Sequence, residues 1–89
     1  MKAIVTVVGE DRVGIIGEIC TTLAAMQINI VDISQTVMQN YFTMMMLVDT
    51  SSASMSFNEI SEGLRAKEQE MGLSIRIQRE DIFQAMHRV

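Results

Sequence analysis

The chain contains no proline, one cysteine and one histidine in 89 residues. Hydrophobic residues make up 48% of it and no low-complexity tract occurs, which indicates an ordered globular protein. The lone Cys20 allows no internal disulfide, so the framework of small secreted proteins is excluded. The apolar run over residues 3–8 is shorter than a signal peptide core or a membrane span. We therefore expect a cytoplasmic protein with no membrane partner.

The sequence also lacks the residue sets on which catalysis and metal binding depend. His87 is the only histidine and lies two residues from the C-terminus, so no Ser-His-Asp or Cys-His arrangement is available. Cys20 falls on the apolar stripe of a predicted helix, which favours a buried structural thiol. Met44, Met45 and Met46 alternate across a predicted strand, so packing explains them better than a soft-metal site. We expect no enzymatic activity, no cofactor and no metal.

Length and charge limit the organisation and the partners of the chain. Eighty-nine residues suffice for a single domain over residues 1–89. A domain of this size buries about 60–65% of its unfolded surface, so association with a second copy would stabilise it. Seven Lys and Arg against eleven Asp and Glu give a net charge of −4, the wrong sign for binding phosphates. Nucleic acid is therefore not an expected partner.

The first half of the chain predicts a strand, a helix and a hairpin. Residues 2–8 are rich in Val and Ile and stop at Gly9, which predicts a buried strand. Residues 14–26 predict a helix whose inner stripe has three- and four-residue steps: Ile16, Ile19, Cys20, Leu23 and Met26. Residues 28–38 alternate, which predicts a half-exposed strand with one apolar face: Val31, Ile33 and Val37. The polar pair at 39–40 then predicts a turn into a strand over 41–48.

The second half predicts a helix, a strand and a short closing helix. Ser56 with Glu59 matches a capping box, and Gly72 stands where a helix ends in the left-handed conformation. The inner face of this helix is expected to carry Phe57, Ile60, Leu64, Lys67 and Met71. Alternation over 73–78 predicts a fourth strand, and residues 80–86 a short helix.

The predicted order, βαββαβ plus a tail, is that of an α+β, ferredoxin-like sandwich. Two helices cover one face of a four-stranded antiparallel sheet with the spatial order 4-1-3-2. The nearly continuous apolar runs of the first and third strands fit the two central places. The alternating second and fourth strands fit the edges.

The helices of such a sandwich leave the other face of the sheet uncovered. Ile4, Val8 and part of the Met44–Met46 cluster are expected to point there, and an apolar patch of this kind usually marks an interface. A symmetric partner is the commonest cover, so we expect a homodimer or a higher homo-oligomer. The alternative is that Ile82, Phe83 and Met86 of the tail fold back over this face.

The segment Gly9-Glu10-Asp11-Arg12-Val13-Gly14-Ile15-Ile16-Gly17 joins the first strand to the first helix. Backbone N–H groups and the helix dipole at this helix start suit a carboxylate, and glycines allow close approach. Asp11 can accept an ammonium group from the same ligand. An α-amino acid carries both charges. The alternative is that Asp11 caps the helix and the glycines only shape the turn.

At this segment the chain resembles the ACT family, because the run from Gly9 to Ile16 is similar to the Asp-Arg-Pro-Gly-hydrophobic loop of that family. Val13 occupies the position where many members have proline. The run Ile28-Asn29-Ile30-Val31-Asp32-Ile33 resembles the Asn-Ile entry to the family's second strand. The resemblance covers essentially the whole chain and is strongest to small stand-alone ACT proteins similar to the regulator of the glycine cleavage system.

The resemblance implies a regulatory domain that binds an amino acid at a homodimer interface and controls a metabolic enzyme or a transcription regulator. The implied pocket lies between the first loop and the start of the second strand. Its loop side would contain Asp11, Val13, Gly14 and Ile15, and its strand side Asn29 and Ile30. Asn29 has a simpler interpretation, in which its side chain only satisfies a local turn.

Two other functions fit this fold class. An RNA-recognition domain would use Tyr41 and Phe42 for stacking, but such a domain needs a basic surface and this chain is acidic. A protein-interaction module with no small ligand is the stronger alternative, because it would explain the apolar content equally well. Only the amino-acid sensor is expected to gain thermal stability from a saturating amino acid.

Overall fold

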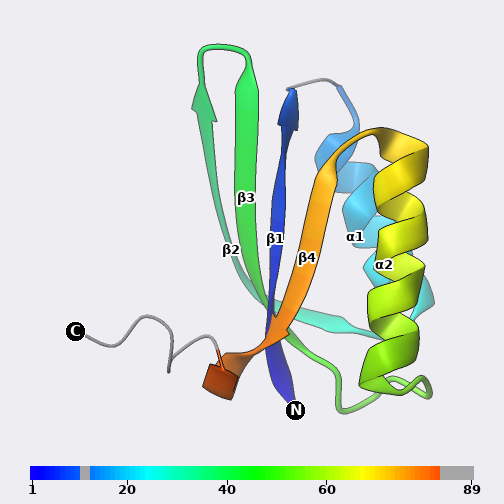
Figure 1. Cartoon of the computed structure of the whole chain (residues 1–89). Helices are drawn as coiled ribbons and strands as arrows, with labels where there is room; N and C mark the ends of the chain where they lie inside the picture. Colours follow the sequence, from blue (N-terminus) through cyan, green and yellow to red (C-terminus); the bar gives the residue numbers. More distant parts are fainter. Residues whose placement is uncertain (11–12, 83–89) are drawn as a thin grey trace.

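The computed structural model describes residues 1–10 and 13–82. Its elements are β1 (Lys2–Glu10), α1 (Ile15–Ala25), β2 (Asn29–Met38), β3 (Tyr41–Asp49), α2 (Phe57–Met71) and β4 (Ser74–Arg79). The strands form one antiparallel sheet in the order β2-β3-β1-β4, with both helices on the same face (Figure 1). The predicted ferredoxin-like fold and strand order are confirmed. No helix among the described residues is both long and apolar enough to cross a membrane.

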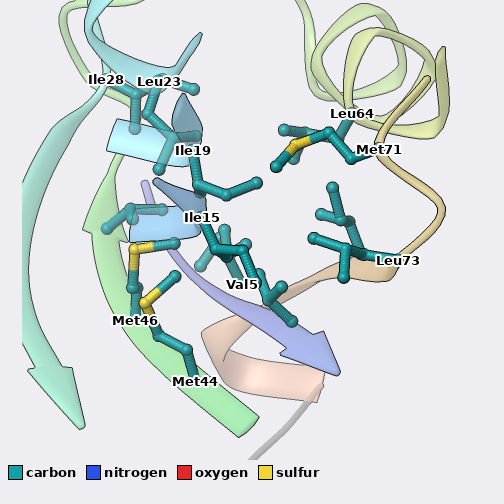
Figure 2. Packing of buried hydrophobic residues seen from close by; sticks show 14 of the residues in the cluster. Val5, Ile15, Ile19, Leu23, Ile28, Met44, Met46, Leu64, Met71 and Leu73 are labelled. Carbon is teal, nitrogen blue, oxygen red and sulfur yellow. The ribbon is translucent and has the colours of Figure 1, made fainter. Parts of the chain in front are cut away.

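The core lies between the sheet and the two helices. Every second residue of β1 and β3 points to the helices, because successive side chains of a strand alternate between its faces. Figure 2 shows the resulting cluster, with side chains from both helices packed on those of the strands. Its fully buried members include Val5, Val7, Ile15, Ile19, Leu23, Met44, Met46, Val48, Ile60 and Leu64.

Both ends of α2 follow the local signals in the sequence. The Ser56 side chain accepts a hydrogen bond from the Glu59 backbone N–H at 3.2 Å, and Glu59 Oε1 accepts one from the Ser56 N–H at 2.8 Å. The hydrogen bond from the Ser56 backbone N–H to the carboxylate is the main cause that lowers the pKa of Glu59, and the Ser56 side chain lowers it further. At the other end Gly72 has φ 68°, and its N–H donates to the Glu68 carbonyl at 2.9 Å. The predicted capping box and glycine stop are confirmed.

β2 is more exposed than the sequence predicted. Ile33 and Val37 pair with Met46 and Phe42, so they face the helix side, yet they are 40% and 51% exposed. The helices do not extend over this edge of the sheet, where the β2–β3 hairpin projects beyond them (Figure 1). A β-bulge between Ile30 and Asp32 places Val31 outside the predicted alternation and exposes it. The prediction of a half-exposed strand was therefore wrong, because nearly all of β2 is exposed.

The inner stripe of α1 also differs from the predicted one. Ile15 is 2% exposed and packs in the core, whereas Ile16 is 37% exposed. Each residue turns a helix by about 100°, so a difference of one residue moves a side chain from the core to its margin. Cys20 is half-buried. Residues 80–82 are helical, and the rest of the predicted closing helix lies outside the described residues.

The face of the sheet away from the helices is named here the open face. The register places Ile4, Val8 and Met45 on it, as predicted, while Met44 and Met46 are buried on the other side. Val8 is 42% and Met45 38% exposed. Of the tail residues proposed as an alternative cover, Ile82 is exposed, and Phe83 and Met86 lie outside the described residues.

Candidate functional site

The start of α1 presents backbone donors rather than a side-chain cap. Its N-cap residue is Gly14, with φ 93°, a left-handed conformation that glycine adopts without steric cost. The first bond within the helix runs from the Glu18 N–H to the Gly14 carbonyl at 2.9 Å. The N–H groups of the preceding residues have no acceptor within the helix. Among the described residues no side chain caps this turn, so its donors can meet an oxygen of a ligand.

The residues predicted for the loop side of the site differ in what they can contribute. Val13 and Gly14 are exposed at the helix start. The side chain of Ile15 is buried in the core, so this residue can offer a ligand only its backbone N–H. Asp11 lies outside the described residues. The N-cap position itself belongs to Gly14.

The strand side of the predicted site lies at the opposite end of the sheet. Asn29, which is exposed, pairs with Asp49, and Asp49 in turn pairs with Lys2 at the start of β1. The loop follows the other end of β1, where Glu10 pairs with Tyr41. Nine strand residues separate these ends by about 27 Å. The starts of α1 and β2 lie at opposite ends of the sheet (Figure 1). A single chain therefore does not bring Gly14 and Asn29 together.

Charge near the start of α1 is already partly balanced. Glu18 in the first turn forms an ion pair with Lys67 of α2, with 3.1 Å between Oε1 and Nζ. The hydrogen bond to Glu18 is the main cause that raises the pKa of Lys67, whose side chain is only 19% exposed. The carboxylate of Glu18 is thus held toward α2. The positive end of the α1 dipole remains available to another anion.

Sequence reasoning missed a hollow of about 480 Å³ beside the loop. Its lining comes from the ends of β1 and α2, the turn between α2 and β4, and the start of β3: Val8, Gly9, Glu10, Tyr41, Met71, Gly72 and Leu73. A Cβ atom at Gly9 would collide with the Leu73 side chain, so the glycine permits this close contact. The predicted strand order already placed the end of β1 beside the start of β4.

The hollow combines an apolar floor with one carboxylate. Met71 and Leu73 are buried at its base, and Glu10 and Tyr41 are exposed at its rim. This lining suits the apolar part of a small ligand rather than a metal. Among the described residues, no three His, Cys, Asp or Glu side chains are grouped closely enough to hold a metal ion.

Comparisons with known proteins agree with the fold. The model of the ACT domain matches residues 2–78. A UPF0237 protein of Clostridium acetobutylicum is 54% identical over 89 residues, which cover all of both chains. The solved structure of an ACT domain protein from Streptococcus pneumoniae has a TM-score of 0.83 and 42% identity, over 98% of each chain. A putative glycine cleavage system transcriptional repressor has a TM-score of 0.76 and 25% identity, over 86% of this chain and 44% of that protein.

Proposed function

We propose, from the premise that this chain belongs to the ACT domain family, that two copies of it bind a free amino acid between them. The ACT fold is a regulatory fold, which supports a regulatory rather than a catalytic role for this domain. The bound amino acid would control a metabolic enzyme or a transcription regulator. We further propose that residues 1–89 act as a single domain.

The observation that carries this proposal is the separation of Gly14 and Asn29 at opposite ends of the sheet. β2 is an edge strand, and an exposed strand edge is a template for pairing with another chain. Two β2 edges that pair antiparallel are related by a two-fold axis near the strand midpoint, at Ile33 and Ser34. This rotation brings Asn29 of the partner subunit to the end of the sheet where Gly14 lies. Two equivalent composite sites result.

The two halves of each site complement the charges of an amino acid. The carboxylate would accept hydrogen bonds from the N–H groups of the first turn of α1, where the dipole also favours an anion. Asp11 and the side-chain carbonyl of Asn29 of the partner subunit would accept hydrogen bonds from the ammonium group. Val13 and Ile30 of the partner subunit would contact the ligand's side chain.

A thermal-shift screen over the twenty amino acids tests ligand binding. A ligand present well above its Kd stabilises the folded state, and we expect at least one amino acid to raise Tm by several degrees. Amide shifts at Gly14 and Asn29 should follow the same titration. Asn29→Ala should abolish the shift in Tm, whereas Asn58→Ala, at an exposed position of α2, should retain it. If none of the twenty amino acids changes Tm or these amide signals, the sensing proposal is wrong.

The pairing of β2 edges is tested by Ile33→Glu. The substitution places two like charges near the proposed two-fold axis, so sedimentation should show loss of this interface and the amino-acid response should disappear with it. Ala66→Glu, at an exposed position of α2, is the matched control and should change neither result. A variant Ile33→Glu that retains its mass and its amino-acid response would refute the β2 arrangement.

The exposed hairpin favours one further candidate function, a protein-interaction module without a small ligand. Val37 and Met38 next to the turn of the hairpin are both exposed, and apolar patches of this kind often mark docking sites. In that case no amino acid would change Tm, and Val37→Lys would abolish the binding of the regulated protein without altering the thermal stability of the domain.

A further inference from the structure

The open face carries an apolar strip with a charge of opposite sign at each end. Ile4, Val8, Met45 and Leu47 supply the apolar surface on the two central strands, with Thr6 and Thr43 among them. Lys2 and Glu10 stand on the same face at the two ends of β1. The proposed β2 pairing extends the sheet sideways and leaves this face uncovered.

This pattern is complementary to itself. Two copies can stack open face to open face about a two-fold axis. If this axis runs across the strands at the level of Thr6 and Met45, each strand lies over its own copy in the opposite direction. Lys2 then faces Glu10 of the partner subunit, and Ile4 faces Val8 of the partner subunit. Each of these contacts occurs twice, because the interface is symmetric. Opposite charges therefore meet at both ends of the strip and apolar residues meet between them, while on the edge strand β4 the exposed Arg76, the register partner of Thr6, meets Arg76 of the partner subunit.

A hollow on the open face fits the same axis. It has a volume of about 210 Å³ and adjoins Met45, and its other lining residues are Ile4, Asp32, Ser34, Met46 and Leu47. Met45 lies at the level of the axis and is partly exposed, so Met45 of the partner subunit would enter this hollow. The unbranched, flexible methionine side chain suits an irregular gap.

The area is sufficient for a specific contact. Four strands of six to ten residues, about 4.8 Å apart and on average about 25 Å long, present about 500 Å² per copy. The two copies together would bury about 1,000 Å², the lower limit for a biological interface.

We propose that the open face is a second contact between copies of this chain, which joins two β2-paired dimers into a closed tetramer. The pairing axis through the midpoint of β2 lies at the level of Ser34, which is the register partner of Met45. The pairing axis is perpendicular to the sheet, and the open-face axis runs across the strands at the same level. The two axes therefore intersect at right angles, as a closed assembly requires. An axis along the strands would instead give an open chain of dimers. The choice of axis depends on the proposed β2 pairing, and thus on the proposed function. The contact itself is inferred from the residues of the open face alone.

Sedimentation of Met45→Glu tests the contact. The charge would have to enter the apolar hollow, so the tetramer should dissociate into dimers that keep the amino-acid response. The control Ala66→Glu should remain tetrameric, and circular dichroism should show both variants folded. A wild-type chain that does not exceed a dimer at high micromolar concentration, or a tetrameric Met45→Glu, would overturn the proposal.

Charge exchange tests the axis. Lys2→Glu and Glu10→Lys should each weaken tetramer formation roughly tenfold, because each creates two like-charged pairs. The double variant should recover most of this loss, and if it does not, the axis is wrong. Deletion of residues 83–89 should leave the tetramer intact. A tetramer that forms only after this deletion would show that the tail covers the face and would refute the proposal.

The two proposals fail in different ways. If Ile33→Glu removes the amino-acid response while Met45→Glu leaves the mass unchanged, only the open-face contact is refuted. If Met45→Glu separates the copies and Ile33→Glu changes nothing, only the β2 pairing is refuted.

Discussion

The two helices cover the same face of the sheet but differ at their N-termini. α2 begins with a reciprocal pair of hydrogen bonds between Ser56 and Glu59, so a carboxylate of the chain itself occupies its first turn. α1 begins at Gly14, where among the described residues no side chain accepts from the first turn. The comparison suggests a division of roles. α2 is complete within the chain, whereas the start of α1 has donors for a carboxylate from elsewhere.

The largest expected effect is the loss of stability when a buried leucine is shortened, and this loss should be equal for the two helices. Leu23 of α1 and Leu64 of α2 are both buried, and each change to Ala should lower the free energy of unfolding by about 2–5 kcal/mol. Urea denaturation of the two variants measures this. Equal losses would limit the difference between the helices to their termini. A loss below about 1 kcal/mol at either position would contradict this view of the core.

Gly14→Ala should affect both stability and ligand binding. A side chain at φ 93° is strained, and we expect a loss of about 1–2 kcal/mol in the free energy of unfolding together with loss of the amino-acid response. Gly17→Ala is the matched control, because a Cβ atom there meets no neighbour and alanine favours a helix. Its stability should rise. Equal effects of the two substitutions in urea denaturation would remove the special role of Gly14.

Ser56→Ala should affect stability alone. Loss of the cap should lower the free energy of unfolding by about 1 kcal/mol. Ser56→Asp should preserve it, because aspartate caps a helix as well as serine does. The thermal shift with an amino acid should be unchanged in both variants. A smaller shift in Ser56→Ala would mean that the start of α2 belongs to the ligand site after all.

The smallest effect is a pH dependence at the start of α2. The folded-state pKa of Glu59 is lowered below its usual 4.5, so its stabilising contribution is present above that value and disappears as the pH falls through the folded pKa. The stability difference between wild type and Glu59→Gln should therefore be larger at pH 7 than at pH 3. Urea denaturation at the two pH values measures it. A difference that does not change with pH would contradict the hydrogen-bonded carboxylate.

Local signals in the sequence predicted α2 and the β2–β3 hairpin well. The capping box, the glycine stop and the turn at Gln39 and Asn40 each depend on a few neighbouring residues. The exposure of Ile33 and Val37 does not, because it depends on how far the helices extend over the sheet. Alternation identifies the face of a strand and cannot show whether another element covers that face.

The resemblance to the ACT family proposed both the residues of the candidate site and its place at a homodimer interface, but not which edge of the sheet would form that interface. The resemblance to the ACT family supplied Gly14 and Asn29, and the placement of these residues had to come from the fold. A signal was present, since a single helix between two parallel strands returns the chain to the end where it began. Asn29 therefore had to lie far from Gly14 in one chain. The burial of the Ile15 side chain had no such signal, because it depends on the turn at which α1 starts.

Tyr41 has a practical consequence for spectroscopy. It is the only tyrosine of a chain that has no tryptophan, and the residue is 57% exposed on the open face. Ultraviolet emission from the protein therefore reports on one known position at the rim of the proposed tetramer contact. Dilution from high concentration should change the accessibility of this ring to a soluble quencher, so the protein carries its own optical probe of assembly.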